Sequence, residues 1–275
     1  GKMCKRTLLN NLKILDVSTE TDLISHLFFS NYSKIEIDYC NPKMCPYQGT
    51  HVACKNDGSF SKDCVGKYWL EPLDDKLKEL ILHEHNMYRN YVAAGKLKCF
   101  HPATRMPVLV WDDSLSKMAE YNVKTCKFAH DKCRSTPTFP YVGQNIYYAS
   151  TARMNISVKG FIKEAIYLWF VEYLDANHEL MMSYKRTVPQ TGHFTLMIND
   201  RQNKVGCAFL KNIQLSKKKL RLKVIFTCNY PSNNILYMPC YKPGPPTKDC
   251  KHINPKYKAL CDDKIDPNDI YWYEK

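Results

Sequence analysis

The 275-residue chain has no run of eighteen or more apolar residues, the length that a membrane-spanning helix requires. Its start also lacks the charged-then-apolar pattern of a signal peptide, and we expect that such a segment has been removed. The length favours one large domain with appendages over two equal domains. We therefore expect a soluble protein without a transmembrane segment.

The motifs of several enzyme classes are also missing. The chain has no GxSxG nucleophile motif and no GxxxxGKS or GxxxxGKT phosphate loop. It has no HExxH zinc motif either, because His83 and His85 in His83-Glu84-His85 are too close in sequence to share one helical face. The absence of these motifs argues against an ordinary hydrolase and against a nucleotide-binding enzyme.

Acidic residues are outnumbered, with 27 Asp and Glu against 40 Lys and Arg, for a net charge of +13. This balance favours anionic partners, although such charge often only keeps a surface hydrated. The segment 211–223 is the most basic stretch, and it is a candidate patch for a heparin-like glycan or an anionic lipid. The alternative is a solvated hairpin turn and a protected edge strand. The patch would consist of Lys211, Lys217, Lys218, Lys219, Arg221 and Lys223.

Cysteine, by contrast, is abundant, with thirteen in the chain. The cysteines are scattered and do not form paired CxxC knuckles, so disulfides are favoured over structural zinc. Disulfides indicate an oxidising compartment and therefore a secreted, extracellular protein. Two sequons, at Asn31 and Asn155, are compatible with glycosylation there.

The sequence divides into four parts. Residues 1–37 show no sustained period and form an unassigned N-terminal extension. Residues 38–71 are turn-rich and hold four cysteines, as expected of a disulfide-stapled module. Residues 72–238 form the main domain, and 239–275 form a proline- and lysine-rich extension with its own cysteines.

Hydrophobic periodicity predicts an α+β main domain. One helix begins near Pro72 and stops at Gly95, a second follows the N-cap Asp112 towards Cys126, and a third covers 157–173. After Gly192 the period changes to two, which predicts strands at 193–198, 205–210 and 220–228. Helices followed by an antiparallel sheet suggest helices layered over that sheet.

Two histidines are candidates for chemistry. His130 lies between Cys126 and Cys133, which would hold its loop in place, and His193 begins the first predicted strand after Gly192. Together with Glu172 they form a plausible divalent-metal or acid-base cluster. We interpret His85, on the first helix, as a buried histidine satisfied by a backbone group.

Several motifs then resemble one family, the CAP superfamily of cysteine-rich secretory, antigen 5 and pathogenesis-related proteins. They are EHNMYR, FAHDKC, GQNI, GHFT, VGCAF and FTCNY, in this order. The segments HPATRMPVLVWDD and KPGPPTKDC are most similar to antigen 5-like proteins of flies. The resemblance implies an α-β-α sandwich of the CAP type, with a stapled N-terminal module and a short stapled C-terminal tail.

The resemblance also implies a cleft in which His130 and His193 face acidic residues, one of them Glu172. The second family acid falls at Gln144, because this chain reads GQNI where many members read GENI. The change removes a negative charge and weakens any proposal of carboxylate-driven catalysis. The two imidazoles would still bind zinc or copper weakly, with Glu172 orienting one of them.

Family disulfides map onto five pairs: Cys40–Cys54, Cys45–Cys133, Cys64–Cys126, Cys207–Cys228 and Cys250–Cys261. Cys99 and Cys240 are extra, and we hypothesise that they pair. Cys4 would then be free or intermolecular.

The resemblance favours a secreted, non-enzymatic binding protein, since family members occur in biting-fly saliva, venoms and reproductive secretions. The alternative is a metal-dependent hydrolase or a copper-dependent redox enzyme at the two histidines. Expected partners are a lipid or sterol, lined by the aromatic stretches 139–148 and 167–173, or an anionic glycan or host protein. The alternative is that the aromatic side chains of these stretches belong to the hydrophobic core. No RGD motif is present, and we expect a monomer without a nucleic-acid partner.

Overall fold

The computed structural model describes residues 37–45, 49–216 and 218–262. The predicted extension 1–37 thus lies almost entirely outside the described residues, as do the calls on Cys4, Lys217 and the Asn31 sequon. Asn155 of the other sequon is exposed, and Ser157 caps the helix that follows.

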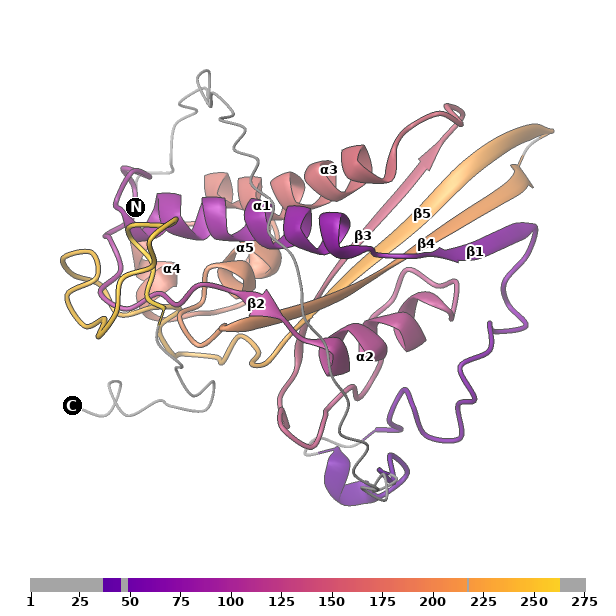
Figure 1. Ribbon diagram of the computed structural model, residues 1–275, viewed down its shortest axis with the longest axis horizontal. Helices are drawn as coiled ribbons and strands as arrows, with labels where there is room; N and C mark the ends of the chain where they lie inside the picture. Colours follow the sequence, from indigo (N-terminus) through magenta and orange to yellow (C-terminus); the bar gives the residue numbers. More distant parts are fainter. Residues whose placement is uncertain (1–36, 46–48, 217, 263–275) are drawn as a thin grey trace, which may run out of the picture.

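The centre of the molecule is a sheet in the order β1-β4-β5-β3, with β2 paired to β4 (Figure 1). Its central pair, β4 and β5, is antiparallel with Cys207 opposite Cys228. β1 and β3 add to this pair in antiparallel fashion, whereas β2 is parallel to β4. The strands are β1 (Lys67–Glu71), β2 (Val110–Trp111), β3 (Gly143–Thr151), β4 (Lys204–Ser216) and β5 (Lys219–Tyr230).

The three longest helices each begin after a capping side chain, of which Asp112 is the N-cap that the sequence predicts. Asp74, Asp112 and Ser157 each accept a hydrogen bond from a backbone N–H of the first turn of α1, α2 and α3. After α1, Gly95 has a φ of +70°, which a glycine adopts without strain. The helices are α1 (Asp75–Ala93), α2 (Asp113–Val123), α3 (Val158–Val171), α4 (His178–Met182) and α5 (Gly192–Met197), with short 3-10 helices at Pro42–Met44 and Glu172–Asp175.

The helices form two layers around the sheet. α1 and α3 cover one face and α2 covers the other (Figure 1). Successive side chains of β5 point to opposite faces of the sheet. Val224 and Phe226 therefore join the larger core, and Ile225 joins the smaller core beneath α2. The predicted α-β-α sandwich is confirmed.

The predicted strand at 193–198 is wrong, because this segment forms the helix α5. Four consecutive side chains, from Phe194 to Met197, are buried, and an alternating strand would bury only every second one. The backbone N–H groups of His193 and Phe194 donate to the Glu172 carboxylate, which caps the start of the helix. A contact with a residue 21 positions away therefore overrides the local pattern.

The strands at 205–210 and 220–228 are confirmed within the longer β4 and β5. Three strands, β1, β2 and β3, are absent from the sequence prediction. β3 contains the GQNI motif, and residues 143–147 are buried in succession, so it lacks the alternation that marks a strand.

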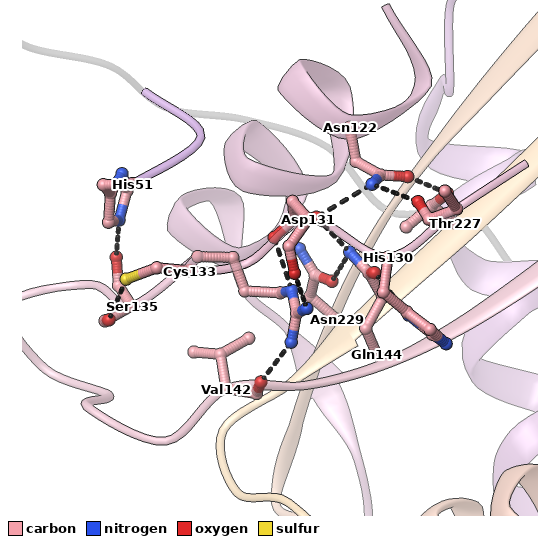
Figure 2. Close-up of polar contacts among 12 residues, drawn as sticks. His51, Asn122, His130, Asp131, Cys133, Ser135, Val142, Gln144, Thr227 and Asn229 are labelled. Carbon is pink, nitrogen blue, oxygen red and sulfur yellow. Dashed lines mark hydrogen bonds and ion pairs between the residues drawn. The ribbon is translucent and has the colours of Figure 1, made fainter. Parts of the chain in front are cut away.

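All five disulfides implied by the resemblance are present. Cys45–Cys133 and Cys64–Cys126 attach the N-terminal module to both ends of the loop that carries His130. Buried His51 adds a hydrogen bond of 2.8 Å from its ring to the Ser135 carbonyl (Figure 2). The module is thus fixed against the main domain.

The predicted Cys99–Cys240 pair is wrong. Cys99 is disulfide-bonded, whereas Cys240 is a free, buried cysteine. Backbone hydrogen bonds fix Cys240 between Met181 and Asp200, where its thiol is enclosed by the core. The C-terminal segment around it is also part of that core, with Tyr241 and Leu260 fully buried.

We expect Cys240 to resist alkylation until the protein unfolds. Burial raises the pKa of its thiol to about 12, so very little reactive thiolate exists at pH 8. Mass spectrometry of the Cys240 peptide after iodoacetamide treatment, with and without guanidinium and without reductant, tests this. Modification in the native protein, or a peptide cross-linked to Cys99, would contradict the assignment.

Candidate functional site

The His130 ring is held by a side-chain network on the edge strand β3 (Figure 2). Gln144 uses its Nε2 to donate to Asp131 Oδ2 at 2.8 Å and to Asn229 Oδ1 at 3.0 Å. Its Oε1 therefore faces His130 Nδ1, 2.7 Å away, as an acceptor. His130 must carry its proton on Nδ1, which leaves the lone pair of Nε2 available.

Asp131 is the centre of this network. Its carboxylate accepts from Arg134 Nε at 2.6 Å and from Asn122 Nδ2 at 2.8 Å, and Arg134 also donates to the Val142 carbonyl (Figure 2). Asn122 in turn accepts from Thr227 of β5. Sequence reasoning missed these residues, although the Asp131–Arg134 spacing of three is a recognisable ion-pair signal.

His193 is oriented by Glu172 in the same manner. Its Nδ1 lies 2.6 Å from Glu172 Oε1, and the other carboxylate oxygen accepts from the backbone N–H groups of His193 and Phe194 at 2.9 Å and 3.1 Å. The proton is on Nδ1, because a carboxylate only accepts, so the Nε2 of this ring is also available as a ligand. The His193 ring stacks beside Trp169, with centroids 6.1 Å apart.

The two rings are close enough to interact electrostatically. Loss of water around its ring lowers the pKa of His130 below its ordinary value, and positive charge on Arg134 and on His193 lowers it further. The hydrogen bond to Gln144 opposes this shift. His130 therefore stays neutral, and able to act as a ligand, to a lower pH than a free histidine.

Buried His85 lies behind the site. Its Nδ1 donates to the Ile81 carbonyl at 2.8 Å, which confirms the interpretation from sequence, and the Tyr230 hydroxyl donates to its Nε2 at 2.8 Å. Burial lowers the pKa of His85 to about 4. Asn145 donates both to Tyr230 and to the His193 carbonyl, so this buried chain of hydrogen bonds reaches the backbone of α5.

Arg89 anchors α5, the helix that carries His193. The sequence analysis quotes this arginine only as part of the EHNMYR motif. Arg89 is fully buried and donates to four backbone carbonyls, those of Pro107, Met197, Asn199 and Gln202. Met197 is the last residue of α5, and Asn199 and Gln202 lie between this helix and β4. Arg89 thereby ties α1 to the turn between α5 and β4.

The predicted basic patch is divided between the two faces of the sheet. The register places Arg221 and Lys223 on one face, opposite Gln214 and Asn212. Lys211 lies on the other face, where it pairs with Glu71 at 3.1 Å and lies over Trp69. Lys211 is therefore not part of one continuous surface with the others.

Most of the aromatic side chains in 139–148 and 167–173 are core. Phe139, Tyr147, Trp169, Phe170 and Tyr173 are buried. Exposed members are Tyr141, Tyr148 and Tyr167, and Tyr148 packs against exposed Phe128 near His130.

Within the described part of the chain, no helix is long and apolar enough to cross a membrane. Among the same residues, no group of three or more His, Cys, Asp or Glu side chains is arranged to hold a metal ion. His130 and His193 thus supply two imidazoles, and the carboxylate of Glu172 is engaged with His193 and Phe194.

The fold and the site together define a disulfide-bonded α-β-α sandwich with two oriented histidines. The family model described as the cysteine-rich secretory protein family, CAP, matches residues 82–230. The chain therefore belongs to the CAP family.

Relatives from biting flies are similar over most of the chain. Venom allergen-1 of Aedes albopictus is 37% identical over 231 residues, covering 82% of this chain and 87% of that protein. Antigen 5 like allergen Cul n 1 of Culicoides nubeculosus is 40% identical over 189 residues, covering 65% and 85%. A crystal structure of NaASP2 with Zn2+ matches with a TM-score of 0.55 at 23% identity, covering 68% of this chain and 96% of that one.

Proposed function

We propose that this chain is a secreted, non-enzymatic binding protein of the antigen 5 type that holds a divalent metal ion weakly between His130 and His193. One observation carries the metal site. Each ring has its Nδ1 committed to an acceptor, Gln144 or Glu172, so each directs its proton-free Nε2 away from those partners.

The donor set suits zinc or copper. Neutral imidazole nitrogens are common ligands of both ions. Two imidazoles without a coordinating carboxylate make a weak site, with water or an exogenous ligand completing the coordination. The five disulfides support placement in an oxidising, extracellular compartment.

The same contacts argue against proton-transfer catalysis. The family's second acid is replaced by the amide of Gln144, which cannot accept a proton as a general base would. The Glu172 carboxylate accepts three hydrogen bonds that orient His193 and cap α5. Gln144 and Glu172 therefore orient the two imidazoles.

Calorimetric titration with Zn2+ and Cu2+ tests the metal site. We expect the His130→Ala and His193→Ala double variant to lose at least tenfold in affinity, and Glu172→Gln to lose about tenfold because a weaker acceptor polarises the ring less. Binding should be weaker at pH 5.5 than at pH 7.5, because protons compete for Nε2. Exposed His252→Ala is the matched control and should bind as the parent protein does.

Unchanged binding by the double variant, with circular dichroism like that of the parent protein, would refute the metal site. Turnover of an ester, a peptide or superoxide by the purified protein, lost in His193→Ala, would establish the enzymatic alternative.

The proposed partner at the remaining surface is a lipid or sterol, or an anionic glycan or host protein. Native mass spectrometry of protein from its own source distinguishes them, because a co-purifying lipid gives a defined added mass. Retention on heparin that is lost at high salt indicates the glycan.

A further inference from the structure

The ends of β4 and β5 form a hairpin tip whose two faces differ in chemistry. Leu215 and Leu220 lie directly opposite each other in the register and are 68% and 58% exposed. They share the face of Ile213 and Leu222, which belong to or pack on the main core. The apolar surface of the core thus continues outward into solvent as a leucine pair.

Basic residues occupy the opposite face and the turn. Arg221 and Lys223 alternate with Leu220 and Leu222 along β5, and exposed Lys219 shares their face. Lys218 lies in the turn with a φ of +61°. Neither β4 nor β5 contains an Asp or Glu, so no acid within these strands offsets the charge.

The tip is a fixed projection. Figure 1 shows the ends of β4 and β5 reaching past the helices α1, α2 and α3 at one end of the sheet. Cys207–Cys228 links the two strands at their other end, and Arg221 donates to the Ser150 side chain and carbonyl of β3. Docking here would require little ordering of the backbone, which lowers the entropic cost of binding.

The tip is also separate from the metal site. Thr151, the last residue of β3, pairs with Leu222, and Gln144 of the His130 network lies seven residues earlier on the same strand. At the rise per residue of a β-strand, the distance from Gln144 to Thr151 is about 23 Å. An effect at the tip can therefore be measured independently of His130 and His193.

We propose that this hairpin tip docks on an anionic lipid surface. Leu215 and Leu220 enter the boundary between headgroups and acyl chains, while Lys218, Lys219 and Lys223 contact the phosphates. A glycan would use the lysines but would leave the leucine pair in water. A second copy of the chain, meeting tip to tip, would bring like charges together.

Vesicle co-sedimentation tests the proposal with phosphatidylcholine alone and with 30% phosphatidylserine added, a composition of about one anionic lipid in three. We expect binding only to the anionic vesicles. Leu215→Ser with Leu220→Ser should weaken it about tenfold or more, because the apolar burial is lost. Lys219→Gln with Lys223→Gln should weaken it about 25-fold, at roughly fivefold for each lysine.

Matched controls remove similar groups elsewhere. Leu168→Ser with Ile253→Ser removes two exposed apolar side chains, and Lys62→Gln with Lys159→Gln removes two exposed charges. Both control variants should bind as the parent protein does. A Leu215→Trp variant adds a direct signal, since its extra emission should shift to shorter wavelength with anionic vesicles and be quenched by brominated lipid.

Three results would overturn the proposal. The first is absence of parent-protein binding to the anionic vesicles. The second is heparin retention that depends on the lysines, with vesicle binding unaffected by the leucine variant, which indicates a glycan. The third is a dimer in solution that the leucine variant converts to monomer, which indicates a second copy.

Discussion

Arg89→Met should lower the free energy of unfolding by about 4 kcal/mol or more. Arg89 is fully buried, so the substitution leaves four carbonyls inside the protein without this donor. A buried polar group without a partner costs about 1–3 kcal/mol, and the effects of neighbouring groups add only in part. The variant also lacks the attraction between the Arg89 guanidinium and buried Asp200.

Guanidinium denaturation with the disulfides intact measures this loss. Arg89→Lys keeps the charge, but a single ammonium cannot reach carbonyls arranged around a planar fork, so we expect an intermediate loss. Exposed Lys76→Met on the same helix is the control and should change stability by less than about 0.5 kcal/mol. A loss below about 1 kcal/mol for Arg89→Met would contradict the anchoring role.

Stability should fall as the pH is lowered from about 6.5 to 4, and His85 should be a main cause. Its folded pKa of about 4 lies below the ordinary histidine value of 6.5. In this window the unfolded chain binds a proton at His85 that the folded protein excludes. The linked loss is about 3 kcal/mol, since each pKa unit corresponds to about 1.4 kcal/mol.

Comparison with His85→Gln isolates this contribution. Buried Asp200 acts with the opposite sign, because burial raises its pKa to about 6 and the folded protein takes up that proton before the unfolded chain does. Both proteins contain Asp200, so the difference between their denaturation midpoints at pH 7.5, 5.5 and 4.5 reports His85. His252→Gln, an exposed control, should parallel the parent protein. Parallel curves for His85→Gln would contradict the assignment.

Local signals in the sequence were sufficient for much of the fold. Asp112 caps its helix as expected, because a capping side chain acts on backbone groups two or three residues away. The β4–β5 strands follow from alternation along each strand. The segment 193–198 shows the same alternation in sequence but forms α5, since Glu172 accepts hydrogen bonds from the N–H groups at the start of this helix.

The sequence by itself determined the CAP family, three main helices, five disulfide pairs and the identity of His130, His193, Glu172 and Gln144. Only the tertiary structure decided which ring nitrogen of each histidine carries the proton, that Cys240 is enclosed without a disulfide, and that the hairpin tip has one leucine face and one basic face. The physical reason is the same in each case. Proton positions, thiol burial and the faces of paired strands depend on partners far apart in the chain, such as Gln144 and Asn229 at a separation of 85 residues, and no local pattern specifies that contact.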